Sequence, residues 1–121
     1  MKTITILLFS VLLLSDVYSQ SFTKMTSAAP SLDGGASRSV NWVDYDNDGL
    51  LDLFVSRGPS AGATPYLYHN DGNGVFTKIT TGPISTASMK ADGSSWGDFN
   101  NDGFVDLCVA TWWNQIDFLF Q

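Results

Sequence analysis

Apolar and polar positions alternate along the chain over short stretches, and no segment after residue 20 keeps the 3.6-residue spacing of an amphipathic helix. Residues 39–43, 51–57, 65–69 and 75–80 are four runs rich in β-branched and aromatic residues. The NDGNG segment at 70–74 is a strong hairpin signal, because Asn and Gly tolerate positive φ. The pattern predicts four short antiparallel strands in succession.

This pattern occurs twice. When the chain is shifted by 54 residues, FTKMT (22–26) aligns with FTKIT (76–80), and WVDYDNDGLLDLFV (42–55) aligns with WGDFNNDGFVDLCV (96–109) without a gap. Eight of the fourteen positions in the longer pair are identical. A tandem unit of about fifty residues with four strands is typical of a β-propeller blade. A sandwich made of hairpins is the alternative fold.

The repeat sets the expected domain boundaries. We predict a leading strand and linker at 20–37, a first repeat at 38–80 and a second, incomplete repeat at 81–121. The second repeat ends in NQIDFLFQ, which matches the third strand PYLYH, and FTKMT at 22–26 matches a fourth strand. A closed propeller needs roughly 4–8 blades. The expected fold is therefore an all-β fragment of a larger propeller, whose blades need neighbouring repeats or self-association.

Residues 1–19 are predicted to be a secretory signal peptide. Lys2 precedes an apolar run at 4–14, and Ser19 suits cleavage just before Gln20. The run is too short to cross a bilayer, although an uncleaved membrane anchor is the alternative. No later stretch is apolar enough to be a membrane helix. We therefore expect a secreted, extracellular or cell-surface protein without a membrane span.

Composition narrows the possible chemistry. All twelve acidic residues are Asp, and Asp favours turns and cation sites over helices. The formal charge of −6, with no basic cluster, argues against a nucleic-acid partner. Cys108 is the only cysteine, so no intrachain disulfide can form, and its strand-like surroundings predict a small buried residue.

The aspartates cluster in two loops that predict calcium sites. Counting Asp44 as position 1, oxygen donors recur at positions 3, 5, 7 and 9, with a glycine at position 6 for a sharp bend. Carboxylates spaced in this way converge on one point and, with the carbonyl of position 7, supply the oxygens that Ca²⁺ takes. The predicted ligands are Asp44, Asp46, Asp48, Leu50 and Asp52 in the first copy, and Asp98, Asn100, Asp102, Phe104 and Asp106 in the second.

Other cation chemistries fit these loops less well. An EF-hand needs a Glu at position 12 and flanking helices, whereas position 12 is Val55 or Val109 within a predicted strand. With no Cys or Glu in the loops and only His69 available, softer or borderline metals have nothing to bind. Asn100 makes the second loop one charge poorer than the first, so we expect it to bind calcium more weakly. Good turn formation by Asp and Asn, without any ion, is the alternative.

The pattern D-x-[DN]-x-D-G-x-x-D followed by a strand resembles the calcium loops of the FG-GAP/VCBS repeat family, which includes the integrin α-subunit propeller. The W-x-D-[YF] lead-in and the L-Y-x-N-D-G-x-G-x-F-T hairpin extend the resemblance over nearly all of residues 20–121. The Phe-Gly and Gly-Ala-Pro signatures are missing, so the likeness is closer to bacterial VCBS-type repeats. The resemblance implies a propeller in which calcium is bound between strands.

The resemblance implies a non-enzymatic role in adhesion or ligand binding, with an extracellular protein or glycan as partner. Two alternatives stay open: an accessory region of an exported carbohydrate-active or other hydrolytic enzyme whose catalytic part lies elsewhere, and a structural spacer. Trp42 and Trp96 recur at the repeat spacing and are expected to pack between blades, whereas Trp112 and Trp113 lie in a loop where they could stack on sugars or seat a protein. His69 is expected to be structural or exposed.

Overall fold

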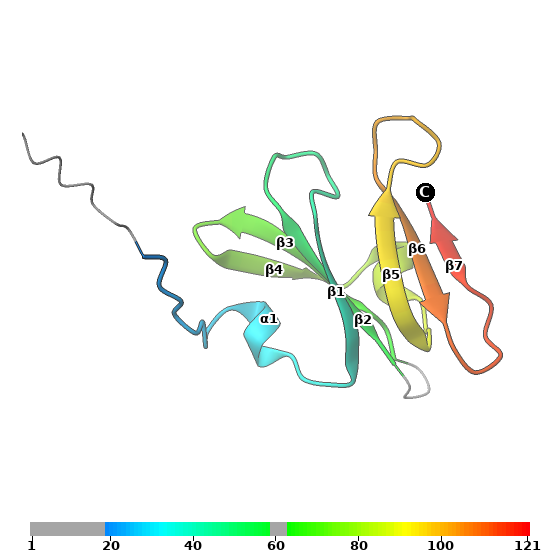
Figure 1. Cartoon of the computed structure of the whole chain (residues 1–121), viewed down its shortest axis with the longest axis horizontal. Helices are drawn as coiled ribbons and strands as arrows, with labels where there is room; N and C mark the ends of the chain where they lie inside the picture. Colours follow the sequence, from blue (N-terminus) through cyan, green and yellow to red (C-terminus); the bar gives the residue numbers. More distant parts are fainter. Residues whose placement is uncertain (1–18, 59–62) are drawn as a thin grey trace, which may run out of the picture.

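The computed structural model describes residues 19–58 and 63–121, which form two antiparallel sheets (Figure 1). The predicted signal peptide therefore lies, except for Ser19, outside the described residues. Sheet A contains β1 (Ser37–Val43), β2 (Asp52–Arg57), β3 (Tyr66–Gly72) and β4 (Val75–Ile79), paired in that order. Sheet B contains β5 (Ala91–Gly97), β6 (Asp106–Thr111) and β7 (Phe118–Phe120), also in chain order.

The predicted all-β fold, with one unit of four strands and one incomplete unit, is confirmed. The helices of the described chain are single turns, α1 (Ala29–Leu32) and α2 (Gly82–Thr86). Each has a proline as its second residue, which suits the first turn because the missing N–H has no helical partner there. Within the described ranges, no helix has the length and apolar character needed to cross a membrane.

The two sheets repeat one another in register. Trp42 pairs with Leu53 in sheet A, and the equivalent Trp96 pairs with Leu107 in sheet B. A register shift follows the first residue of both β1 and β5, at Ser37 and at Ala91. The sequence repeat is therefore a structural repeat, and it includes the register shift near the start of β1 and of β5.

The main core lies between the sheets. Phe54 and Leu67 on sheet A meet Leu107 and Val109 on sheet B, and all four are almost fully buried. Trp96 lies edge-on to Phe54 at 5.5 Å between ring centroids. Its predicted position between blades is therefore confirmed. The same prediction for Trp42 is wrong: Trp42 is 57% exposed and lies near Phe76 of its own sheet, because no second sheet of the described chain covers that face.

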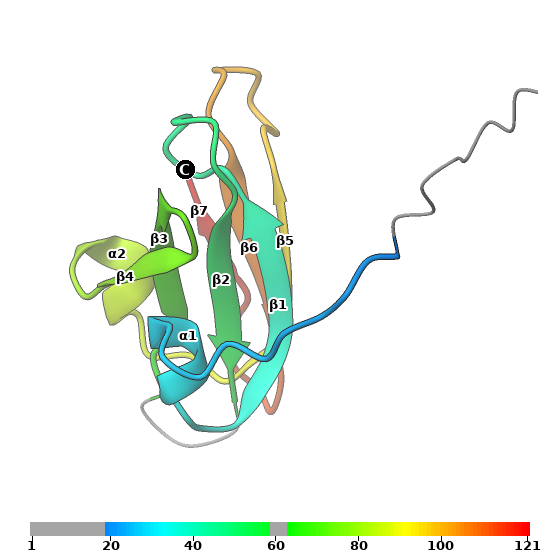
Figure 2. The ribbon, with the colours of Figure 1, turned by 90° about the vertical axis from the view of Figure 1, so that its left-hand side faces the viewer.

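The opposite face of sheet A carries a second, smaller core. Leu53, Val55 and Tyr68 are buried there beneath Ala29 of α1. The Tyr68 hydroxyl donates to Asp33 Oδ2 at 2.5 Å, and Lys78 Nζ lies 2.9 Å from the same oxygen. The segment before β1 is therefore attached to the sheet through α1 and Asp33 (Figure 2).

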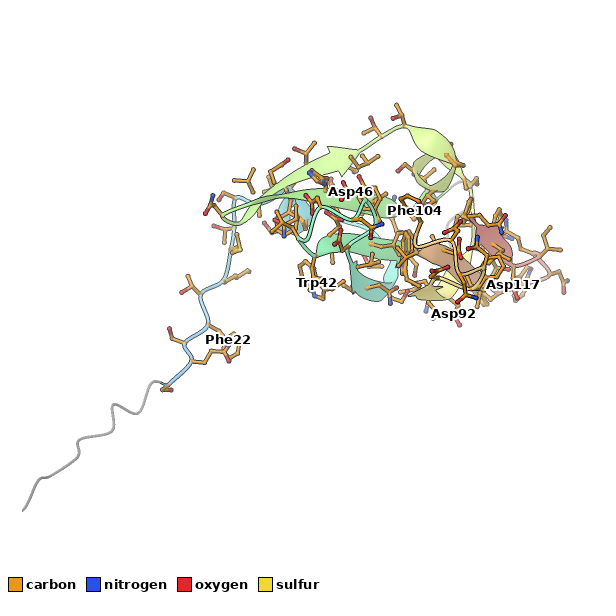
Figure 3. The ribbon with its side chains drawn as sticks, turned by 90° about the horizontal axis from the view of Figure 1, so that it is seen from above. Phe22, Trp42, Asp46, Asp92, Phe104 and Asp117 are labelled. Carbon is orange, nitrogen blue, oxygen red and sulfur yellow. The ribbon has the colours of Figure 1, made fainter. Side chains whose placement is uncertain are left out.

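Two expectations are corrected by the structure. Residues 22–26 form no strand, and Phe22 is 88% exposed on a segment that leads away from the sheets (Figure 3). The equivalent residues of β4 are a strand because β3 lies beside them, and no described strand lies beside 22–26. Cys108 is exposed, not buried, because it faces the outer side of sheet B, whereas its equivalent Phe54 faces sheet B from sheet A.

Candidate metal centre

The two Asp-rich loops lie at the same end of the molecule. Loop 1 (44–51) joins β1 to β2, and loop 2 (98–105) joins β5 to β6 (Figures 1 and 2). Asn47 Nδ2 of loop 1 donates to the carbonyl oxygen of Gly103 in loop 2 at 3.1 Å. The view from above shows Asp46 and Phe104 near one another at this end (Figure 3). The repeat thus brings both predicted sites to one rim.

Each loop is shaped by its own carboxylates. In loop 1, Asp44 accepts hydrogen bonds from the backbone N–H groups of Asp48 and Gly49, both at 3.0 Å. In loop 2, Asp98 accepts from Asp102 at 3.1 Å and from Gly103 at 3.0 Å. These backbone groups turn inward because each glycine adopts a positive φ, +89° at Gly49 and +90° at Gly103. The sequence repeat therefore encodes the same turn twice.

The aspartate at position 9 anchors each loop to the sheet. Asp52 is fully buried and accepts from the backbone N–H of Tyr45 at 3.1 Å and of Asn70 at 2.8 Å. Burial raises the pKa of Asp52, and these two hydrogen bonds act in the opposite direction. Asp106 is 4% exposed and accepts from Phe99 at 2.9 Å. A buried carboxylate at the first position of β2 and of β6 therefore closes both loops.

The loops differ in how many carboxylates converge. In loop 1, oxygens of Asp44, Asp46 and Asp52 lie within 4.8 Å of one another. No such group of three occurs in loop 2 among the residues the structure describes. There, the Asn100 amide donates to Asp102 Oδ2 at 2.9 Å, where loop 1 has the Asp46 carboxylate. The backbone N–H groups of Leu50 and Phe104 donate hydrogen bonds to Asp48 and Asp102. The backbone carbonyl oxygens of Leu50 and Phe104 are the remaining predicted metal ligands.

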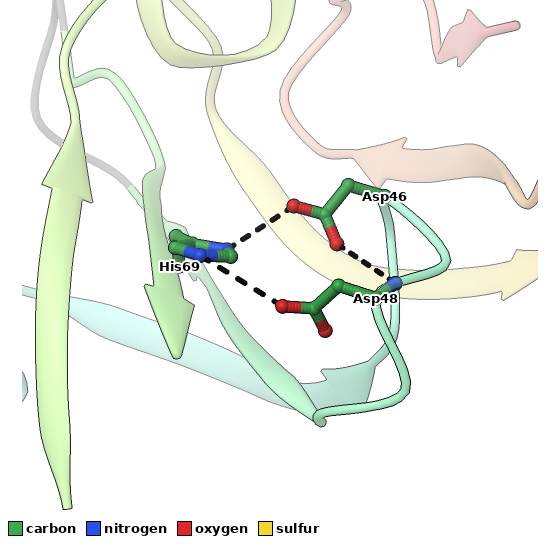
Figure 4. A group of neighbouring side chains, drawn as sticks. All are labelled: Asp46, Asp48 and His69. Atoms are coloured by element: carbon green, nitrogen blue, oxygen red, sulfur yellow. Dashed lines mark hydrogen bonds and ion pairs between the residues drawn. The ribbon is translucent and has the colours of Figure 1, made fainter. Parts of the chain in front are cut away.

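His69 also belongs to this centre, which the sequence analysis missed. Its Nδ1 lies 3.1 Å from Asp46 Oδ2, and its Nε2 lies 3.9 Å from Asp48 Oδ2 (Figure 4). The same Nδ1 lies 3.4 Å from Asp52 Oδ1. Strand register brings His69 to the loop, and spacing along the chain does not reveal it. Antiparallel pairing of β2 with β3 joins Leu53 to Tyr68, so one further step places His69 opposite Asp52.

The donor set of loop 1 fits a hard divalent cation. Several carboxylates share a small space, and among the ion pairs of the described residues none joins a Lys or Arg to a loop aspartate. Carboxylate and carbonyl oxygens in a turn that glycine bends are the ligands Ca²⁺ prefers. The acidic cluster of loop 1 could therefore hold a metal ion through Asp44, Asp46 and Asp52.

Comparison with known families identifies the repeat. Residues 55–109 match the model of the FG-GAP-like repeat. Val55 and Val109 are equivalent positions of the internal repeat, so the match spans one full period, from β2 through β6, and includes loop 2. The resemblance to the FG-GAP repeat family is confirmed, and the chain carries an FG-GAP-like repeat, a module of the β-propeller type. Neither the curated proteins nor the solved structures contain a match.

Proposed function

We propose that this chain is an exported calcium-binding module of the β-propeller type, in which calcium is structural and the module serves adhesion or ligand binding. The observation that carries the proposal is the convergence of Asp44, Asp46 and Asp52 in a turn that the second repeat reproduces. Export follows from the predicted signal peptide, and the family to which the repeat belongs is typically extracellular.

A structural role for calcium follows from where the loops sit. Each loop connects two paired strands, and its buried aspartate, Asp52 or Asp106, begins the second of them. An ion bound there neutralises the loop and holds the strands together, as a disulfide would in another exported domain. At roughly millimolar calcium and a dissociation constant of about 10⁻⁴ M, such binding stabilises the fold by about 1.4 kcal/mol per site.

We propose that the chain itself is not an enzyme. A metal that takes part in catalysis needs an acid or base beside it and room for a substrate. The loop carboxylates instead accept hydrogen bonds from backbone N–H groups of their own turns, which fits a structural role. An accessory region of an exported carbohydrate-active or other hydrolytic enzyme is the second candidate.

The ligand-binding part of the proposal rests on the loop between β6 and β7. Trp112 and Trp113 lie there with ring centroids 5.6 Å apart, and Trp113 is 72% exposed. This loop lies at the opposite end of sheet B from loop 2 (Figure 1). Calcium can therefore stabilise one end of the strands while exposed aromatics at the other end contact an extracellular protein or glycan.

Isothermal titration with Ca²⁺ tests the proposed metal role. We expect two sites in the wild-type chain, one remaining site in Asp48→Ala and one in Asp102→Ala. The site left in Asp102→Ala should be the tighter of the two, because loop 1 has one more carboxylate than loop 2. Asp92→Ala is the control, since Asp92 is an exposed aspartate on β5 outside both loops, and it should titrate like the wild type.

Two results would contradict the proposal in different ways. Absence of calcium binding in the wild-type chain removes the metal role altogether. Equal affinities in Asp48→Ala and Asp102→Ala leave that role intact. They would show that the additional carboxylate at position 3 of loop 1 does not raise its calcium affinity above that of loop 2.

A further inference from the structure

Residues 22–26 match a strand in sequence but form none in the described chain. Their sequence FTKMT is identical to FTKIT (76–80) at four of five positions, and Val75–Ile79 is the strand β4. We propose that residues 22–26 pair as a strand with β7 of a second copy of this chain. The inference goes beyond the proposed function, because the partner is a strand edge and no metal takes part.

β7 offers the edge that such a strand needs. Sheet B is ordered β5-β6-β7, so among the described strands β7 pairs with β6 alone, whereas its counterpart β3 pairs with both β2 and β4. An unpaired edge presents its N–H and C=O groups to another chain. Leu119, in the middle of β7, is 60% exposed. β7 can therefore accept a strand of the kind that β4 supplies to β3.

The internal repeat predicts the register of this pairing. Leu67 of β3 pairs with Ile79 of β4. Leu119 is the counterpart of Leu67, because the two residues pair with equivalent positions of β6 and β2. Met25 is the counterpart of Ile79 at the spacing of 54 residues. Met25 should therefore lie opposite Leu119 of the second copy.

A cavity on sheet B suits the side chain of Phe22. In sheet A, the equivalent Phe76 packs on the smaller core and lies 6.1 Å from Trp42 between ring centroids. The counterparts of Trp42 and of two residues of that core line a cavity of about 280 Å³: Trp96, Leu107 and Phe120. Phe22 is 88% exposed in its own chain (Figure 3). Insertion into this cavity removes an aromatic ring from water, which favours the pairing.

The connection through α1 favours a second copy over the chain's own β7. α2 follows β4 of sheet A, and its Ile84 packs against the core between the sheets, so α2 connects a strand of one sheet to the sheet stacked on it. α1 is its counterpart and packs on the face of sheet A that lies opposite sheet B (Figure 1). Residues 22–26 should therefore belong to a sheet stacked on that face. Sheet B of the same chain lies on the other face, so the acceptor is sheet B of another copy.

The proposed contact joins two different surfaces, so each copy can donate one strand and accept another. A head-to-tail contact of this kind closes into a ring when the rotation between copies permits it. Propellers contain about 4–8 sheets and each copy supplies two, so we expect rings of about two to four copies.

Disulfide trapping tests the predicted register. Every chain carries Cys108→Ala, so that the introduced thiols are the only ones. Chains with Met25→Cys are mixed with chains with Leu119→Cys under oxidising conditions. We expect a disulfide between the two kinds of chain, because paired residues on neighbouring strands lie about 4.5–5.5 Å apart between Cα atoms. Lys24→Cys in place of Met25→Cys is the matched control and should form far less of it, since its side chain points to the other face of the strand.

Two results of this experiment would overturn the inference. One is a yield from Met25→Cys that is no higher than the yield from Lys24→Cys. The other is a monomeric chain that carries both Met25→Cys and Leu119→Cys and closes an internal disulfide, because the acceptor is then the chain's own β7.

A second measurement needs no cysteine. Sedimentation velocity of the full chain should show association that grows with protein concentration, and Thr23→Pro combined with Lys24→Pro should abolish it. Neighbouring N–H groups of a strand face opposite edges, so one of the two prolines removes a donor that faces β7. Thr23→Ala combined with Lys24→Ala keeps both N–H groups and should associate like the wild type. A wild-type chain that stays monomeric, or association that the prolines do not change, would refute the strand pairing, whereas the calcium titration tests the proposed function separately.

Discussion

Asp33 shows how a single side chain attaches the N-terminal segment to sheet A. Its carboxylate accepts from the hydroxyl of Tyr68, which is 1% exposed, and pairs with Lys78 of β4. The hydrogen bond from Tyr68 and then the one from Lys78 lower the pKa of Asp33. Burial and the neighbouring Asp33 raise the pKa of Tyr68, so its hydroxyl stays protonated and donating.

The charge of Asp33 should stabilise the fold in a pH-dependent way. A carboxyl whose pKa is lowered on folding contributes stability above its ordinary pKa of 3.8, and that contribution is lost as the pH falls through the lowered value. Asp33→Asn keeps the shape but removes the charge, and should cost about 1 kcal/mol at neutral pH. Urea denaturation at about pH 7 and about pH 3 should show the difference from wild type shrinking at the lower pH. A pH-independent difference would show that the charge is not the cause.

At the scale of single residues, the sequence predicts only contacts between residues that lie close together along the chain. The loop aspartates could be identified because alternate positions of a tight turn face one centre wherever the rest of the chain lies. The contacts of His69 with Asp46 and of Asp33 with Tyr68 depend on strand pairing across long connections. Register joins such residues, and spacing along the chain does not specify register.

Among the elements, the strands of both repeats follow the predicted pattern closely. β2 and β4 begin at 52 and 75, within a residue of expectation, because Asp-Gly and Asn-Gly turns define their starts. The segment at 22–26 has nearly the same residues as β4 but forms no strand. Its composition permits a strand, but no described strand lies beside it to which its backbone can form hydrogen bonds. An element therefore depends on its partner as much as on its own sequence.

The loop between β6 and β7 is the element in which we expect ligand binding. Trp113 and Asn114 both have positive φ, at 60° and 59°, and such strain in a bulky residue is typical of functional loops. Trp113→Ala should therefore weaken binding to a glycan or an extracellular protein found by array screening, by about tenfold or more for an exposed aromatic anchor. Trp42→Ala removes another exposed tryptophan and is the control. Equal losses in both variants would show that this loop is not the binding surface.

For the whole molecule, the sheets stack so that each repeat presents one face to the next. Sheet A buries Phe54 against sheet B, whereas Cys108, at the equivalent position of sheet B, lies on an exposed face beside a cavity of about 260 Å³. The recurring tryptophans predicted that the repeats stack. They did not predict which of the two tryptophans is covered. Exposure depends on what lies next to a repeat, and equivalent residues can therefore be core in one repeat and surface in the other.

Trp96 and Trp42 allow this stacking to be measured with a matched pair of variants. Trp96 lies against Phe54 between the sheets, whereas Trp42, its equivalent, has only Phe76 of its own sheet nearby. Trp96→Ala removes contacts from the shared core and should lower the free energy of unfolding by about 2–3 kcal/mol, less than for a fully buried tryptophan. Trp42→Ala should cost about 1 kcal/mol or less, the worth of one aromatic pair at the surface. Urea denaturation followed by far-UV circular dichroism gives both values, and similar losses in the two variants would mean that the contact between the sheets contributes little to stability.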